Sequence, residues 1–377
     1  MPQNVDSLNA RVGKTLKEFT DYDRTVDIVS GFESFFNNLD YKNHLIYFDR
    51  FPRMPIPHKT PDFTALFNNY GIIFEMTKGI AKGTDDKPLE KKLKQLLKYD
   101  THFEFRCDGQ NHRVMPENKD IVLILDHRNS NEAFMRIIQK IEENSEFNFK
   151  NNLIFLDYSF IPEDGCYSIN KFAGKNNCFR DVSLPENIQL DKRVWFRGKS
   201  LQFYPKHFML QKFKNRFCND TPPNIYTAVF LWNEILYNYL DADQRNLYQK
   251  GSSRIKQDIN INADQLVKDI NTKYIKDGNV HTKWVIGAMR FMEKANMVEF
   301  ISSRDIVVSY HNLPKPRPSK AHQGGAEALQ HDELNELARQ IAYKHWSSTQ
   351  GRKRGKRSSI KLAPPKPKQR QITIYDF

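Results

Sequence analysis

The sequence predicts an α/β protein in three parts: a core in the order α-β-β-β-α-β, a smaller unit of three helices and a β-hairpin, and an extended tail. First, residues 20–160 alternate between apolar residues at helical spacing and short apolar runs typical of buried strands. Second, three amphipathic helices between residues 225 and 295 precede two short extended runs. Third, residues 314–377 carry 14 Lys and Arg against 5 Asp and Glu, in a chain of net charge +13. This asymmetry indicates a polyanionic partner met partly by an extended arm.

Composition excludes several classes of protein. No stretch approaches the ~20 apolar residues of a membrane span, and the N-terminus lacks the apolar core of a signal peptide. The four cysteines form no C-x-x-C pair, so the sequence indicates neither a zinc site nor a disulfide scaffold. We therefore expect an intracellular protein with no membrane partner, in the cytoplasm and nucleoid, or in the nucleus if the host is eukaryotic.

The first elements of the core are a helix and a short strand. Apolar residues recur at helical spacing between Arg24 and Leu39, and the run from Leu45 to Phe48 is typical of an extended segment. These two elements open the predicted core domain, to which we assign residues 1–160.

Two acidic residues flank a predicted β-hairpin. The strands cover residues 61–67 and 72–78, and the turn between them contains Asn69 and Gly71. Asp62 would lie near the start of the first strand and Glu75 near the end of the second, so pairing brings both carboxylates to the same end of the sheet. Two hard oxygen ligands at one sheet edge suit Mg²⁺, or Mn²⁺ in its place. The hairpin therefore predicts a metal site that acts on a phosphate group.

The remaining core elements follow in alternation. A lysine-rich helix over 88–99 places Gln95 and Tyr99 four residues apart, so both share one face. Residues 120–126 read as a buried strand, 131–143 as a helix and 152–157 as another strand. The helix face that carries Gln95 and Tyr99 is placed to cover one end of the sheet.

The core resembles the PD-(D/E)xK nuclease superfamily over roughly residues 20–160. Pro61-Asp62 is similar to the first motif of that superfamily, Glu75 to the acidic position of the second, and Gln95-x-x-x-Tyr99 to the pattern of its RecB-like branch. The resemblance implies a restriction-endonuclease-like αβββαβ fold and a catalytic set of Asp62, Glu75, Lys78, Gln95 and Tyr99. It also offers Glu33, on the first helix, as a third metal ligand beside Asp62 and Glu75, although a solvated helix face is the alternative for Glu33.

The catalytic lysine departs from the family pattern. The family carries lysine two residues after the acid, where this chain has Thr77, and Lys78 follows one step later. Because side chains alternate along a strand, Lys78 points away from Glu75 unless the strand ends or bulges there. Three alternatives stay open: Lys78 turns into the site, Thr77 occupies the position in an atypical enzyme, or the domain is an inactive remnant.

The second part divides into a connecting region and a helical unit. Residues 161–223 interleave basic and aromatic residues, which suits either a surface that follows a nucleic-acid backbone or an ordinary core with a lysine-rich exterior. Residues 224–313 predict a winged helix, with His281, Lys283 and Arg290 on the third helix facing a DNA groove. Arg304 would lie at the wing tip near phosphates. Winged helices also bind proteins, and that alternative stays open.

The tail, 314–377, contains one predicted helix, Ala326–Trp346, and then a basic run that includes Arg352, Lys353 and Arg354. Pro- and Lys-rich sequence of this kind stays extended, and its cations bind phosphates without sequence preference. The last seven residues read Gln-x-x-Ile-x-x-Phe, formed by Gln371, Ile374 and Phe377. They resemble, with one aromatic fewer, the PCNA-interacting motif that binds sliding clamps.

These observations favour a Mg²⁺-dependent DNA endonuclease with a DNA-binding winged helix and a clamp-binding tail. The contexts that fit are DNA repair, replication, restriction and mobile-element processing, since TnsA-type nucleases also join such a core to a winged helix. The alternative is a non-catalytic DNA-binding adaptor that keeps a degenerate nuclease fold. The sequence leaves the oligomeric state open, with a homodimer among the alternatives.

Overall fold

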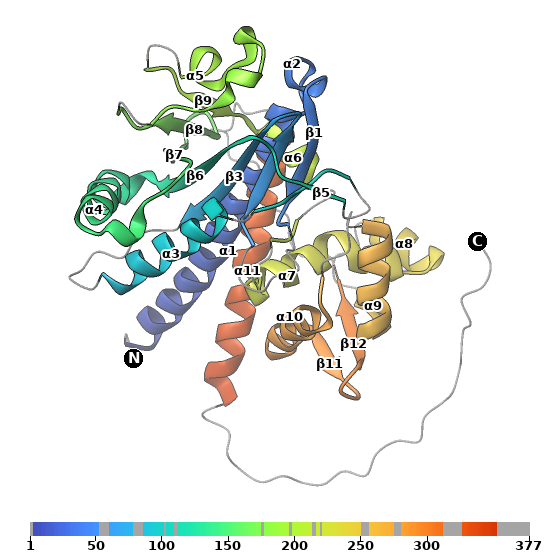
Figure 1. The fold of residues 1–377 in the computed structure, drawn as a ribbon. Helices are drawn as coiled ribbons and strands as arrows, with labels where there is room; N and C mark the ends of the chain where they lie inside the picture. Colours follow the sequence, from blue (N-terminus) through green and yellow to red (C-terminus); the bar gives the residue numbers. More distant parts are fainter. Residues whose placement is uncertain are drawn as a thin grey trace.

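A curled seven-stranded sheet forms the largest element of this mixed α/β protein (Figure 1). The structure, a computed structural model, describes residues 3–52, 60–77, 86–101, 103–108, 112–174, 177–195, 198–212, 216–218, 221–249, 256–274, 280–311 and 326–352. The strand order is β1-β2-β3-β6-β7-β8-β9. The strands are β1 (Leu45–Arg50), β2 (Phe63–Phe67), β3 (Tyr70–Thr77), β6 (Asn118–Asp126), β7 (Asn152–Ile161), β8 (Cys166–Lys171) and β9 (Leu201–Phe203).

The sheet is parallel at its centre and antiparallel at both sides. Strands β3, β6 and β7 run parallel, whereas β1-β2-β3 and β7-β8-β9 are antiparallel. The parallel strands are joined through α3 (Lys87–Thr101) and α4 (Ser130–Glu143), as parallel neighbours require. The carboxyl ends of β3, β6 and β7 therefore meet at one edge. A short hairpin, β4 (Phe105–Arg106) and β5 (Arg113–Val114), follows α3.

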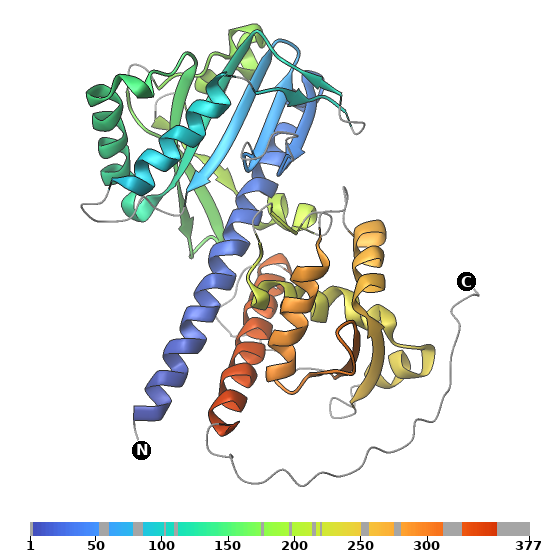
Figure 2. The same cartoon turned by 60° about the horizontal axis from the view of Figure 1, so that its bottom comes forward.

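Each face of the sheet has its own apolar cluster. Phe74 of β3 packs with Phe32 of the first helix, α1 (Gln3–Phe36), at 5.0 Å between ring centroids. Its neighbour Ile73 belongs to the cluster that contains Leu93 of α3. Successive side chains of β3 thus point to opposite faces of the sheet. Helix α1 covers one face, and α3 and α4 cover the other, as Figure 2 shows.

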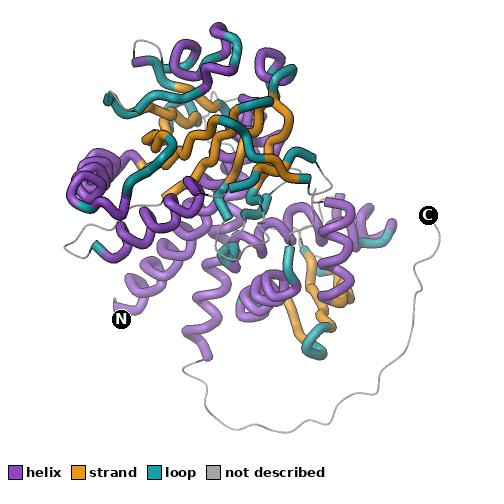
Figure 3. The backbone as a smooth tube through the Cα atoms, in the orientation of Figure 1, coloured by secondary structure: helices purple, strands orange, loops and turns teal. Residues whose placement is uncertain are grey.

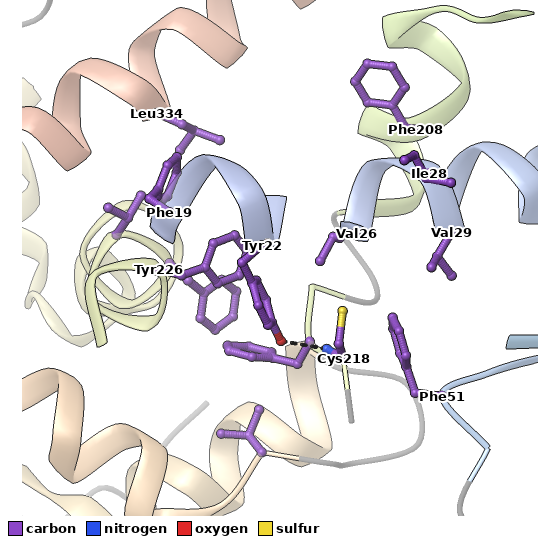
Figure 4. Packing of buried hydrophobic residues seen from close by; sticks show 14 of the residues in the cluster. Phe19, Tyr22, Val26, Ile28, Val29, Phe51, Phe208, Cys218, Tyr226 and Leu334 are labelled. Atoms are coloured by element: carbon purple, nitrogen blue, oxygen red, sulfur yellow. Dashed lines mark hydrogen bonds between the residues drawn. The ribbon is translucent and has the colours of Figure 1, made fainter. Parts of the chain in front are cut away.

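Helix α1 is far longer than its apolar pattern predicts. It begins at Gln3 rather than near Arg24 and contains 34 residues, about 50 Å at 1.5 Å per residue. Its second half lies under the sheet, and its first half extends beyond the sheet to α7 (Asn224–Phe230) and α11 (Ala326–Arg352) (Figure 2). The rings of Tyr22 and Tyr226 lie 4.5 Å apart, and the Tyr22 hydroxyl accepts a hydrogen bond from the Cys218 N–H at 2.7 Å (Figure 4). One continuous core therefore joins the sheet to the helices below it.

The connecting region 161–223 contributes to the sheet and its core. It supplies β8, β9, α5 (Leu190–Arg193) and α6 (Pro205–Lys212), and the small helix α2 (Leu39–Lys42) lies near α5, where Arg193 pairs with Asp40. Trp195 and Phe208 are buried, and the buried Arg216 pairs with Glu234 at 2.5 Å. These residues therefore belong to an ordinary core, which is the second of the two alternatives that the sequence offers for this region.

A second unit follows from residue 224 (Figure 3). Helix α7 continues through a π turn, Leu231–Ile235, into a 3₁₀ turn, Leu236–Tyr239. Next come α8 (Ala242–Gln249), β10 (Gln257–Asn262), α9 (Ala263–Asp269), α10 (Thr282–Lys294), β11 (Val298–Phe300) and β12 (Asp305–Tyr310). The three predicted helices, seen as α7, α9 and α10, and the hairpin lie where the sequence predicts them, but α8 and β10 were not predicted. Strand β10 completes an antiparallel sheet in the order β10-β12-β11.

Helix α11 belongs to the packed body, although the sequence assigns its residues to the tail. Its side chains Leu334, Ala338, Ile341 and Ala342 are buried, in contact with α1, α7 and α10. The Trp346 indole N–H donates to the Thr15 hydroxyl at 3.0 Å. The tail beyond residue 352 lies outside the described residues. No helix in the described part of the chain has the length and apolar content that a bilayer crossing requires.

Asp120 is a buried carboxylate at the start of β6, and burial raises its pKa from 3.8 to about 7. Its Oδ2 accepts from the Tyr70 hydroxyl at 2.7 Å and from the Arg180 N–H at 2.6 Å. Within the described part of the chain, Oδ1 is buried with no hydrogen-bond partner. Burial therefore disfavours the charged form of Asp120.

We expect the stability of the protein to fall, relative to an Asp120→Asn variant, as pH rises from 4 to 8. The folded state holds the Asp120 proton more tightly than the unfolded state, so ionisation above pH 4 costs stability until the folded pKa is passed. A shift of this size corresponds to at most about 4 kcal/mol, and asparagine keeps the oxygen that accepts from Tyr70 and Arg180. Urea unfolding of both proteins at pH 5 and pH 8 checks this. An equal pH dependence for the two would contradict it.

Candidate active site

The two predicted carboxylates lie at the same end of the β2-β3 hairpin. Asp62 immediately precedes β2, and its N–H donates to the Phe74 carbonyl at 3.1 Å. Since Phe63 pairs with Phe74, continuing that register places Asp62 opposite Glu75. The Asp62 Oδ2 accepts from the N–H of Met76 at 2.6 Å, which ties this carboxylate to β3. The hairpin thus brings both acids together.

Three side chains of α3 surround the Glu75 carboxylate. Lys92 Nζ lies 2.7 Å and Gln95 Nε2 2.9 Å from Glu75 Oε1, and the Tyr99 hydroxyl donates to Oε2 at 3.0 Å. Gln95 also donates to the Tyr99 hydroxyl at 2.7 Å. The three residues follow the i, i+3, i+7 spacing of one helix face, so α3 presents all of them to β3.

Burial and charge act against each other at Glu75. Only 5% of this residue is exposed, and burial raises its pKa, while the Lys92 ammonium and three hydrogen bonds pull it down. The pKa of Tyr99 is raised by burial and by the Glu75 carboxylate, so its hydroxyl stays protonated and acts as a donor.

Lys92 is the functional candidate that the sequence reasoning missed. The predicted lysine, Lys78, lies outside the described residues, and β3 ends at the half-buried Thr77. Among the described residues, the cation in contact with Glu75 comes from α3. The signal in the sequence was the position of Lys92, one helical turn before Gln95, but the lysines of α3 at 87, 91, 92, 94 and 98 conceal it.

Glu33 does not join the group around Glu75. It pairs with Arg50 at 2.8 Å, and Arg50 also donates to the Ser30 hydroxyl at 3.1 Å. Glu33 lies on α1, which covers the sheet face opposite the one that Glu75 presents to α3. In this structure Glu33 is the half-buried partner of an arginine, and its assignment as a third metal ligand stays a prediction.

The predicted DNA-binding residues lie on the second unit. Lys283 and Arg290 are exposed on α10, seven residues apart. Arg290 covers the Phe300 ring at 3.6 Å and pairs with Glu293 at 3.0 Å. Arg304, in the turn between β11 and β12, lies 3.5 Å from Asp264.

The predicted tail residues are mostly beyond the described part of the chain. Arg352 ends α11, and nothing about its side chain is described. Lys353, Arg354, Gln371, Ile374 and Phe377 lie outside the described residues.

One group of metal-binding side chain types occurs elsewhere in the described residues, formed by Cys107, Asp108 and His112. Their ligand atoms lie within 4.8 Å of one another, and Cys107 Sγ is 3.1 Å from His112 Nδ1. The His112 N–H donates to the Asp108 carboxylate at 3.1 Å. Sulfur and imidazole are not ligands that Mg²⁺ prefers.

The Asp62 and Glu75 carboxylates supply hard oxygen ligands, and Glu75 Oε2, which accepts from Tyr99, keeps lone pairs for a cation. The donor set at this edge of the sheet therefore fits Mg²⁺ or Mn²⁺. Comparisons of the chain with models of protein families, with curated proteins and with solved structures find no significant match.

Proposed function

We propose that this protein is a metal-dependent DNA nuclease whose active site is the β2-β3 edge. The observation that carries the proposal is the buried Glu75 carboxylate, held by Lys92, Gln95 and Tyr99 with Asp62 on the adjoining strand. The order α1, β1-β2-β3, α3, β6, α4, β7 supports it, because it agrees with the αβββαβ plan that the motifs imply.

Each residue of this site has its own role in the proposed cleavage of DNA. Asp62 and Glu75 would hold Mg²⁺ or Mn²⁺, which supplies an activated water and offsets charge on the scissile phosphate. Lys92 donates from a protonated amine and stabilises negative charge beside Glu75. Gln95 and Tyr99 fix the Glu75 carboxylate, so that its oxygens keep their positions when a metal arrives.

The second unit provides a DNA-binding surface within this proposal. Helices α7, α9 and α10 and the three-stranded sheet agree with a winged helix, in which α10 would enter the major groove. Lys283 and Arg290 on α10 and Arg304 at the hairpin turn would contact DNA. The contacts of Arg290 with Phe300 and Glu293 hold its side chain against the hairpin beforehand.

The tail adds a tether. Arg352, Lys353 and Arg354 would contact phosphates, and Gln371, Ile374 and Phe377 would bind a sliding clamp. Such a tether raises the local concentration of the nuclease at DNA that carries a clamp. The proposed roles are DNA repair, replication, restriction or mobile-element processing, inside the cell.

Asp62→Ala is expected to abolish Mg²⁺- or Mn²⁺-dependent cleavage of linear, circular, branched and single-stranded DNA, because it removes a metal ligand. Glu132→Ala, an exposed acid on α4, is the matched control and should cut at the wild-type rate. The assay includes chelator, and circular dichroism confirms that each variant folds. Full activity in the Asp62 variant would sink the assignment.

A specific observation favours a second candidate, the DNA-binding adaptor. Glu75 accepts from three donors, Lys92, Gln95 and Tyr99, which is also the arrangement of a structural polar cluster. Wild-type protein that binds DNA but cuts none of these substrates, with either metal, would favour the adaptor over the nuclease.

A further inference from the structure

A further buried carboxylate lies within β7, level with the carboxyl end of β6, where it holds an exposed histidine. Asp157 Oδ2 is 2.8 Å from Nδ1 of His127, the residue that follows β6, and accepts from the Ser130 hydroxyl at 3.0 Å. Its Oδ1 accepts from Asn170 Nδ2 at 2.9 Å. The Asp157 side chain is 9% exposed and that of His127 is 58% exposed.

These hydrogen bonds fix the orientation of the His127 ring and the ring nitrogen that carries a hydrogen. An ionised Asp157 only accepts hydrogen bonds, so the Nδ1 that faces it carries a hydrogen. The ring's other nitrogen, Nε2, points away from Asp157, on a side chain that is more than half exposed. A buried carboxylate that orients an exposed imidazole in this way is typical of a residue that contacts a ligand.

The histidine lies along the same edge of the sheet as Glu75. Glu75 pairs with Leu123 of β6, and Leu125, two residues further on, pairs with Asp157. Paired residues on neighbouring strands, and residues two apart on one strand, point to the same face of the sheet. Glu75 and Asp157 therefore lie on one face. Two strand spacings of about 4.8 Å and two residues of about 3.3 Å put their Cα atoms roughly 12 Å apart.

Along β7 and β8, this face of the sheet changes from apolar to polar residues. Leu123 and Phe155 belong to the apolar cluster under α3 and α4. One step further along the strands, the paired row is Thr77, Leu125, Asp157 and Asn170, and the next row on β7, β8 and β9 is Ser159, Ser168 and Gln202. Polar residues therefore line this face from β7 toward β9, and Leu125 of β6, between them and the Glu75 site, still belongs to the apolar cluster.

We propose that His127 binds a backbone phosphate of the DNA strand whose scissile phosphate lies at Glu75. The proposal rests on the nuclease function above and extends its substrate path over β6 and β7. A protonated imidazole donates from both nitrogens, one to Asp157 and one to a phosphate oxygen. A separation of roughly 12 Å keeps this phosphate within a few nucleotides of the cut.

The test measures DNA affinity, so that it does not depend on cleavage. Wild-type protein, His127→Ala, Asp157→Asn and the control His112→Ala are compared on a fluorescent duplex with Ca²⁺ in place of Mg²⁺, over a range of salt concentrations. His112 is also exposed with a polar partner, but it lies in the β4-β5 turn. We expect His127→Ala to weaken binding about 3- to 10-fold and to lower the salt slope by about 0.9, the value for one lost phosphate contact. Asp157→Asn should give a smaller loss, and His112→Ala none.

To identify the phosphate that His127 contacts, a neutral methylphosphonate replaces each phosphate of the duplex strand in turn. At one position, within a few nucleotides of the cut, it should weaken wild-type binding and leave the His127→Ala variant no weaker than on unmodified DNA. Equal affinity and salt slope for wild type and His127→Ala would overturn the inference, as would methylphosphonate losses that are the same in both proteins. If the wild type binds DNA without cutting it, the nuclease proposal fails, and the methylphosphonate coupling still decides whether His127 contacts a phosphate.

Discussion

Replacing Lys92 with methionine is expected to lower metal-dependent cleavage by about 100- to 1000-fold, because it removes the cation beside the reacting phosphate. The same change leaves Glu75 buried without its 2.7 Å partner. The loss of one member of a buried pair costs about 3 kcal/mol or more, so we also expect a clear fall in stability at pH 8.

A double variant separates these two effects. Glu75→Gln with Lys92→Met replaces the charged pair by neutral groups of similar size, so it should recover most of the stability while remaining inactive. Urea unfolding and the cleavage assay on the two single variants and the double variant complete the cycle. Wild-type cleavage by Lys92→Met would remove this lysine from the site.

The pH dependence of the single variant gives a further check on the same pair. Burial raises the pKa of Glu75, and Lys92 opposes that rise. Without Lys92 the pKa rises further, so the folded state keeps the Glu75 proton to higher pH. Stability lost at pH 8 is then partly regained at pH 5, where the carboxyl is protonated. The defect of Lys92→Met should therefore shrink as pH falls.

A chain that ends at residue 325 is expected to lose at least about 5 kcal/mol of stability. It lacks α11, whose side chains Leu334, Ile341 and Trp346 pack against α1 and its neighbours. Each large apolar side chain returned to water costs roughly 1.5 to 3 kcal/mol. Removal of α11 also exposes the α1 and α10 surfaces that it covers. Urea unfolding should show a much lower midpoint or no cooperative transition.

A chain that ends at residue 352 is the matched control. It keeps α11 and should unfold like the full-length protein, while it loses eight Lys and Arg together with Gln371, Ile374 and Phe377. We expect weaker DNA binding with a flatter salt dependence, and no binding to a sliding clamp. Equal stability of the chains ending at 325 and 352 would contradict the packing role of α11.

The sequence predicted the elements whose patterns are local. The β2-β3 hairpin with Asp62 and Glu75, the helix face with Gln95 and Tyr99, and the strands β6 and β7 all follow from alternation or helical spacing within a few residues. Contacts between distant segments left no such pattern. The pairing of Glu33 with Arg50 and the choice of Lys92 among the lysines of α3 depend on which helix packs on which sheet face.

Weak or masked patterns explain the other misses. Strand β10 carries only Ile259 and Ile261 as inward apolar residues, set among Asp and Asn, which are rare in strands. The first half of α1 spaces its apolar residues widely, with Leu8, Val12 and Phe19 on one face. Its partners are α7 and α11, more than 200 residues away along the chain, so its role shows only in the folded protein.

The hydrogen bond from Trp346 to Thr15 joins residues 331 positions apart and has a consequence for the newly made protein. Ribosomes add about 5 to 20 residues per second, so α1 waits roughly 15 to 60 s after its own synthesis before α11 exists. During that time Leu8, Val12 and Phe19 have no α11 to cover them. The nascent chain therefore passes through a long aggregation-prone interval in which α1 is a natural binding segment for chaperones, and the core cannot close until α11 has been made.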